Sequence, residues 1–187
     1  LLAVVPTAFL ANPDDLSNAV GTPCAANVTN AWLDIVLVID VSDGMNITDL
    51  QELGTQLADM FKNFTIGQNP RHSSRVAIVA YAADVGYIYN WTDVTNYADL
   101  EHELLKLYTY NTGTSATNLH NSLRATADIL SRQSSYRPQA IIIAASRYDQ
   151  TGFNYAGDIA KALMLDGIDF VTCRLLDIAI KVMIQIL

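Results

Sequence analysis

The sequence predicts an α/β fold with three layers, in which helices cover both faces of a doubly wound, mostly parallel central sheet. Residues 33–40, 75–81 and 140–145 form β-branched, nearly continuous apolar runs, which are typical of strands buried on both faces of a parallel sheet. Segments whose apolar residues recur at helical spacing separate these runs. Strands that alternate with amphipathic helices indicate the α/β class.

The first predicted strand, 33–40, leads through a short loop, 41–46, into a predicted helix over 49–61. Thr48 and Gln51 have the spacing of a capping box, which places the helix start directly after the loop. The predicted buried face of this helix consists of Leu50, Leu53, Leu57, Met60 and Phe61.

The middle of the chain predicts a hairpin followed by two helices. A strand over 75–81 turns at 84–86 into a second strand over 87–91. In that second strand, the alternation of Tyr87, Tyr89 and Trp91 favours rings that cover the core or the sheet edge over a binding platform. The helices are predicted over 97–108, with Leu100, Leu104, Leu105 and Tyr108 on one face, and over 118–132, with Leu119, Leu123, Ala127 and Leu130 on one face.

The last predicted elements are a strand over 140–145, a helix near 155–165 that ends before Gly167, and a strand over 170–173. Upstream of all of these, residues 1–31 are interpreted as a signal-peptide remnant and a linker, because an apolar start gives way to Pro, Gly and Asn residues. A single domain is therefore expected over 32–187.

Composition restricts the possible partners. The chain has 187 residues and a net charge of −8, whereas a nucleic-acid binder needs a basic surface. Apolar residues make up 51% of the chain, enough to build a core. No apolar run reaches the roughly 18 residues that a membrane span requires. A globular domain with no nucleic-acid partner and no membrane span is expected.

The sequence also predicts a secreted or extracellular protein. Four asparagines stand in N-x-T glycosylation motifs: Asn27, Asn46, Asn63 and Asn90. Together with the apolar leader, these motifs favour the secretory route. The two cysteines, Cys24 and Cys173, have neither the number of a disulfide framework nor the spacing of a zinc site. Cys173 lies in a buried-strand pattern that favours a packed free thiol, and a bridge to Cys24 is the alternative.

The loop after the first strand contains the most informative residues. Ligands of open α/β sheets bind at the carboxyl ends of the strands. Asp40 and Ser42 stand there, two positions apart, and their oxygens are hard ligands that suit Mg²⁺. The segment 39–45, Ile-Asp-Val-Ser-Asp-Gly-Met, resembles the Asp-x-Ser-x-Ser motif of the Rossmann-like von Willebrand factor type A and integrin I domains.

Two further segments carry the same resemblance. Residues 113–123 resemble the threonine loop of the family, with Thr117 at the metal-contacting position, and residues 140–147 resemble the apolar strand that ends in Thr-Asp-Gly. The similarity covers about residues 32–171 and implies a metal-ion-dependent adhesion site. The first strand and the Asp-Gly-Met run also resemble the A domains of nematode secreted proteins, which implies an adjacent C-type lectin domain in the full-length protein.

The chain departs from the family at the metal site, which in the family uses an Asp, two Ser, a Thr and a second Asp. The chain keeps Asp40, Ser42 and Thr117. Gly44 stands where a serine is expected and Ser146 where the second aspartate is expected. Asp149 is available to compensate, and Asp43 occupies a position that should point away. Losing one carboxylate removes a large attraction for a divalent ion, so a degenerate site without a resident cofactor is predicted. In that case Asp40 and Ser42 serve to cap the next helix and fix the loop.

The end of the chain is atypical for the family, in which a closing helix follows the last strand. Residues 175–187 are nearly all apolar, with Asp177 and Lys181 as the only charges. This segment predicts either an altered closing helix or a chain that is truncated here.

Taken together, the sequence predicts an extracellular, non-catalytic recognition or adhesion module that binds a protein or a matrix ligand. One alternative is Mg²⁺-dependent capture of a carboxylate through Asp40, Ser42 and Thr117, and another is a spacer beside a lectin domain. An enzyme is disfavoured, because the sequence shows no nucleophile motif or P-loop. The three histidines are also scattered along the chain, at His72, His102 and His120.

Overall fold

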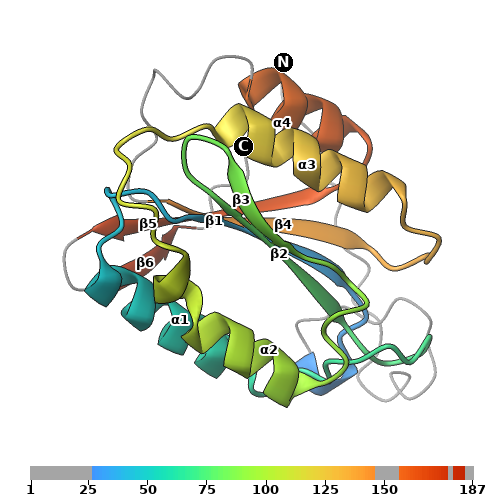
Figure 1. The fold of residues 1–187 in the computed structure, drawn as a ribbon. Helices are drawn as coiled ribbons and strands as arrows, with labels where there is room; N and C mark the ends of the chain where they lie inside the picture. Colours follow the sequence, from blue (N-terminus) through green and yellow to red (C-terminus); the bar gives the residue numbers. More distant parts are fainter. Residues whose placement is uncertain (1–26, 146–155, 177–178, 184–187) are drawn as a thin grey trace.

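The centre of the molecule is a six-stranded sheet with the order β3-β2-β1-β4-β5-β6 (Figure 1). This computed structural model describes residues 27–145, 156–176 and 179–183. The strands are β1 (Asp34–Asp40), β2 (Arg75–Tyr81), β3 (Val85–Tyr89), β4 (Gln139–Ala145), β5 (Asp169–Leu176) and β6 (Ala179–Met183). Strands β2, β1, β4 and β5 are parallel, and β3 and β6 pair antiparallel at the two edges. The predicted mostly parallel sheet is confirmed.

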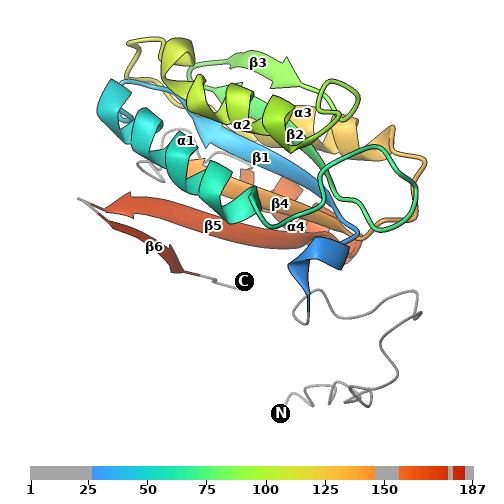
Figure 2. The same ribbon diagram turned by 90° about the horizontal axis from the view of Figure 1, so that it is seen from below.

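Helices cover both faces of this sheet, as predicted. One face carries α1 (Ile47–Phe61), α2 (Tyr97–Leu105) and the 3₁₀ helix η3 (Leu107–Tyr110), and the other carries α3 (Leu119–Ser131) and α4 (Ala156–Leu165) (Figures 1 and 2). A short 3₁₀ turn, η2 (Val28–Asn30), precedes β1. None of the described helices has the length and hydropathy of a membrane span.

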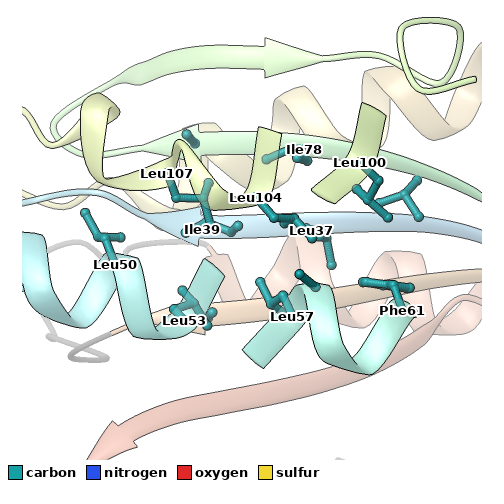
Figure 3. Close-up of a cluster of buried hydrophobic side chains, with 14 of the residues drawn as sticks. Leu37, Ile39, Leu50, Leu53, Leu57, Phe61, Ile78, Leu100, Leu104 and Leu107 are labelled. Carbon is teal, nitrogen blue, oxygen red and sulfur yellow. The ribbon is translucent and has the colours of Figure 1, made fainter. Parts of the chain in front are cut away.

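The core explains why the first strand is apolar without interruption. Every residue of β1 is buried. Leu37 and Ile39 pack against the leucines of α1 and α2 (Figure 3), while Val36 and Val38 belong to the cluster beneath α3 and α4. A strand covered on both faces has no position at which a solvated polar side chain is accommodated.

Helix α1 begins earlier than the sequence predicted. Its N-cap is Asn46, whose side chain accepts a hydrogen bond from the Asp49 amide at 3.0 Å, and Asp49 Oδ2 accepts one from the Asn46 amide at 3.3 Å. The capping box predicted at Thr48 and Gln51 is wrong, because this reciprocal pair satisfies the first turn two residues upstream. The helix start therefore lies on the loop that follows β1.

Three residues predicted to be buried are exposed: Met60 in α1, Leu105 in α2 and Tyr108 in η3. The helix predicted over 97–108 ends at Leu105, and the chain then tightens into η3. The tighter turn changes which side chain faces the core, so that Leu107 is buried in place of Tyr108.

The predicted hairpin of β2 and β3 is confirmed, and its aromatic residues cover the core. Tyr87 and Tyr89 pack, partly buried, against the cluster of α1 and α2. The Tyr87 ring stacks on that of Tyr110, with 4.3 Å between centroids, and burial raises the pKa of Tyr110 above its ordinary value. Trp91 lies beyond the end of β3 and is buried in the cluster of the opposite face. The prediction that these rings are not a binding platform agrees with this packing.

The C-terminal region differs from the expected closing helix. Ala179–Met183 forms strand β6, which pairs antiparallel with β5, so that Cys173 lies opposite Val182. The prediction of an altered helix is wrong for these residues. β-branched residues alternate there, and pairing with β5 gives the backbone groups along the edge of the sheet their hydrogen-bond partners. Cys173 itself is a buried, free thiol, as predicted, and burial raises its pKa. Cys24 lies outside the described residues.

Candidate functional site

The candidate site lies at the carboxyl ends of the parallel strands, on the left in Figure 1. Two loops meet there: residues 41–46, which join β1 to α1, and residues 111–118, which join η3 to α3. The third predicted loop begins at Ser146 and contains Asp149, and both residues lie outside the described ones. The description of the site therefore rests on the first two loops.

Asp40 and Ser42 hold the first loop in a compact turn. Asp40 is the last residue of β1, and both side chains are buried. Asp40 Oδ1 accepts a hydrogen bond from the Ser42 amide at 2.9 Å, and Ser42 Oγ accepts one from the Gly44 amide at 3.3 Å. The Met45 amide donates to the Ser42 carbonyl at 2.9 Å. These contacts agree with the predicted role of Asp40 and Ser42 in fixing the loop. The prediction that they also cap the next helix is wrong, because Asn46 is the N-cap of α1.

The backbones of the two loops pair with each other. The Thr112 amide donates to the Val41 carbonyl at 3.1 Å, and the Asp43 amide donates to the Thr114 carbonyl at 2.7 Å. Because of this pairing, the segment that follows Asp40 lies beside the segment that leads to Thr117. The structure therefore brings together the two loops from which the sequence predicted site residues.

Asn111 fastens the two loops through its side chain. Its Nδ2 donates to the Met45 carbonyl at 2.6 Å and to the Ser42 carbonyl at 3.3 Å, and its Oδ1 accepts from the Gly113 amide at 2.9 Å. One side chain thus satisfies three backbone groups of two loops. The sequence analysis missed this residue, because the only local signal is an Asn-x-Gly turn pattern with Gly113 at a positive φ of 63°.

The second loop ends at the N-terminus of α3, which two hydrogen bonds of Asn118 hold in place. The Asn118 amide donates to the Ala82 carbonyl at 2.7 Å, and Asn118 Oδ1 accepts from the Asn121 amide at 3.1 Å as the N-cap of α3. Thr117, directly before this cap, is half-buried. The N-cap was a signal available in the sequence, because an asparagine stands immediately before the apolar helical pattern.

The two described loops supply only part of the predicted set of cation ligands, because Ser146 and Asp149 lie outside the described residues. Of the three ligands that the sequence predicted within the described residues, Asp40 supplies one carboxylate, and Ser42 and Thr117 supply hydroxyls. The Asp40 and Ser42 oxygens already accept backbone amides, and Gly44 supplies no side-chain oxygen. Affinity for such ions follows the number of charged ligands. Within the described ranges, no group of three His, Cys, Asp or Glu side chains is arranged to hold a metal.

The three histidines lie on different elements and form no shared site among the described residues. His72 lies in the loop before β2, with a positive φ of 57°. His102 lies in α2 and His120 in α3, on opposite faces of the sheet.

The arrangement of the sheet and of these two loops agrees with a family comparison. A model of the von Willebrand factor type A domain matches residues 34–186. The chain belongs to the von Willebrand factor type A family. The resemblance inferred from the three sequence segments is therefore confirmed.

Individual relatives of this von Willebrand factor type A domain are distant. C-type lectin domain-containing protein 160 of Caenorhabditis elegans is 22% identical over 152 residues, which are 80% of this chain and 24% of that protein. The chain thus spans about a quarter of the length of this curated relative.

Solved structures share the fold of this von Willebrand factor type A domain. Proximal thread matrix protein 1 from the mussel byssus has a TM-score of 0.63 at 16% identity, over 79% of this chain and 37% of that one. A von Willebrand factor type A protein from Catenulispora acidiphila has a TM-score of 0.51 at 16% identity, over 76% of this chain and 32% of that one. The family is one of protein-interaction and adhesion modules, and the two loops lie where open α/β sheets bind ligands.

Proposed function

We propose that this domain is an extracellular recognition module that binds a protein or matrix ligand without catalysis and without a divalent ion. The observation that carries the proposal is that the first loop is held by hydrogen bonds within itself. The side-chain oxygens of Asp40 and Ser42 accept hydrogen bonds from backbone amides of the same loop. A loop of this kind keeps its shape without a metal. Family membership supports a binding role.

Two comparisons support the extracellular setting. One solved structure with this fold is a matrix protein of the mussel byssus, and the curated nematode relative is described as a C-type lectin domain-containing protein. A neighbouring lectin domain in the full-length protein and secretion of the chain are parts of the same proposal.

Metal-dependent binding is the second candidate, because one observation favours it. The loop containing Asp40 and Ser42 and the loop that leads to Thr117 lie side by side, as a shared ligand set requires. In that case Mg²⁺ would be held by these three side chains and would attract a carboxylate of the partner.

The test is retention of proteins from an extracellular-matrix extract on the immobilised full chain, in EDTA and in Mg²⁺. The matched variant is Asp40→Asn, which removes the charge and keeps the Oδ1 acceptor for the Ser42 amide. We expect the same proteins to be retained in both buffers and by both chains. Retention that requires Mg²⁺ and is lost in Asp40→Asn would establish the second candidate instead. Retention no greater than that of a blank column would leave a spacer as the function.

A further inference from the structure

The described structure gathers three of the four glycosylation motifs at one end of the molecule. Asn27 caps the turn η2 before β1, Asn63 follows α1, and Asn90 follows β3. These three segments lie together at the lower right of Figure 1 and at the right of Figure 2, at the end where the parallel strands begin. Asn46, the fourth, caps α1 at the opposite end, beside the candidate site.

Hydrogen bonds connect the segments that carry the three motifs. The hydroxyl of Thr65, in the Asn63 motif, donates to the carbonyl of Thr29, in the Asn27 motif, at 2.7 Å. Gln68 Nε2, in the loop that contains Asn63, donates to the carbonyl of Trp91, in the Asn90 motif, at 2.5 Å. The three motifs are therefore parts of one surface rather than separate loops.

The loop between α1 and β2 is itself anchored to the segments that precede β1 and β4. Trp32 Nε1 donates to the Pro70 carbonyl at 2.9 Å, and Arg137 Nε donates to the Ser73 carbonyl at 3.0 Å. Because these contacts fix the loop from both sides, groups attached to it stay near η2 and the end of β3.

The acceptor nitrogens of the motifs are available. All four asparagines are exposed. Among the described residues, the Nδ2 atoms of these four asparagines donate no hydrogen bond. In the Asn27 motif, the Thr29 hydroxyl and amide donate hydrogen bonds to Asn27 Oδ1, at 2.7 and 3.0 Å. Neither of these hydrogen bonds involves Asn27 Nδ2, the atom to which a glycan is attached.

We infer that this end of the molecule is a glycan-covered pole that carries N-linked glycans on Asn27, Asn63 and Asn90 and is closed to protein partners. The inference rests on the proposed passage of the chain through the secretory route. The donor is a lipid pyrophosphate-linked oligosaccharide: a bond forms between Nδ2 and C1 of the first sugar, the sugar–phosphate bond breaks, Nδ2 loses one proton, and the lipid pyrophosphate leaves.

The position of the pole restricts where a large ligand can bind. With the strand-start end covered, and with a glycan on Asn46 beside the Asp40 loop, the helical faces remain accessible. Lys62, directly before Asn63, and Arg71 are exposed residues of the loop that carries this motif. A glycan on Asn63 would therefore also shield a segment that a protease would otherwise reach.

The first measurement is site occupancy. The full chain is expressed behind a cleavable secretion signal in a eukaryotic host, and glycopeptides from medium and cells are mapped by mass. We expect each of Asn27→Gln, Asn63→Gln and Asn90→Gln to lose one glycan, and Asn30→Gln, an exposed asparagine outside any motif, to lose none. Asparagine is changed rather than threonine, because replacing Thr65 would also remove its hydrogen bond to Thr29. Two or more of the three sites found unmodified would overturn the inference.

The second measurement tests coverage. Trypsin cleavage after Lys62 or Arg71 should be slower by about threefold or more in the native glycoprotein than in Asn63→Gln. The reason is that the glycan covers the loop in the native glycoprotein, whereas the loop is exposed in the variant. Equal rates would overturn the coverage of the pole even with full occupancy. Neither readout involves a ligand, so a failure here differs from a failure of the proposed binding function.

Discussion

The side chain of Asn111 illustrates how single residues maintain the candidate site. It bonds carbonyls of the first loop through Nδ2 and an amide of its own loop through Oδ1. A buried carbonyl that loses its donor is left unsatisfied, and the cost of such a group exceeds the gain of an average hydrogen bond. The shape of the site therefore depends on the side-chain amide group of Asn111, with its donor and its acceptor, and not only on a polar side chain at this position.

Asn111→Asp keeps the size of the side chain and replaces its donor by an acceptor that faces two carbonyls. We expect the free energy of unfolding to fall by about 1–3 kcal/mol, measured by urea denaturation. Asn30→Asp, at an exposed position with no side-chain hydrogen bond among the described residues, should change it little. An Asn111→Asp chain as stable as the wild type would show that the two loops are held by other contacts.

Gly54 permits the close contact between α1 and α2. A Cβ atom built at Gly54 would lie 2.2 Å from the Leu104 carbonyl oxygen, whereas one built at Gly157 in α4 meets nothing within 4 Å. Gly54→Ala should therefore lower the free energy of unfolding by about 3 kcal/mol, as overpacking does. Gly157→Ala should leave it unchanged or raise it by up to about 1 kcal/mol, as Ala favours a helix. The account of the helix contact fails if both variants behave alike in urea.

At the scale of an element, the start of α1 combines a structural and a surface role. Asn46 is both the N-cap of the helix and a glycosylation motif at the rim of the candidate site. Because the cap uses Oδ1 and a glycan would be attached at Nδ2, the two roles are compatible.

For protein made without glycans, Asn46→Ala should cost about 1 kcal/mol of stability, whereas Asn46→Asp should cost little, because aspartate is also a good N-cap. Thermal unfolding of the two variants separates these outcomes. In secreted material we expect Asn46 to carry a glycan that obstructs a large ligand, so that the partner binds on a side face. An unmodified Asn46 in a peptide map would remove that restriction.

The start of α2 predicts a pH dependence. Hydrogen bonds from the Thr95 hydroxyl and amide hold the pKa of Asp99 below its ordinary value of 3.8. A lowered pKa in the folded state means that the carboxylate stabilises the fold above the unfolded value, and this contribution is lost as the pH falls through the folded value. The melting temperature of Asp99→Ala should therefore lie below that of the wild type near about pH 6 and approach it below about pH 3. A gap that does not depend on pH would contradict this role.

At the scale of the whole molecule, much of the fold was predictable because burial on both faces leaves a direct mark on the sequence. The apolar run of β1 indicated both a strand and its central place. The start of α1 was mispredicted because two cap patterns overlap, Asn46 with Asp49 and Thr48 with Gln51, and local spacing does not rank them. The strand β6 was missed because a short apolar run does not distinguish a helix from a strand.

The site was predictable only in part. The Asp40 loop follows from the rule that ligands bind at strand ends. The Asn111 contact joins residues 66 positions apart in the chain, so that no local pattern contains it. Such contacts are decided by the tertiary packing of α1 and η3 against the sheet.

The proposed recognition without a divalent ion is tested most directly by thermal unfolding of the full chain in EDTA and in millimolar Mg²⁺. An ion at a hundredfold excess over its Kd adds about 2.7 kcal/mol, so an unchanged melting temperature is the expected result for the wild type. Gly44→Ser with Ser146→Asp should create a Mg²⁺-dependent rise that Asp40→Ala removes. The backbone at position 44 does not require glycine, because the described glycines with positive φ are Gly113 and Gly167. A wild-type domain that gains several degrees in Mg²⁺ and loses them in Asp40→Ala would contradict the account.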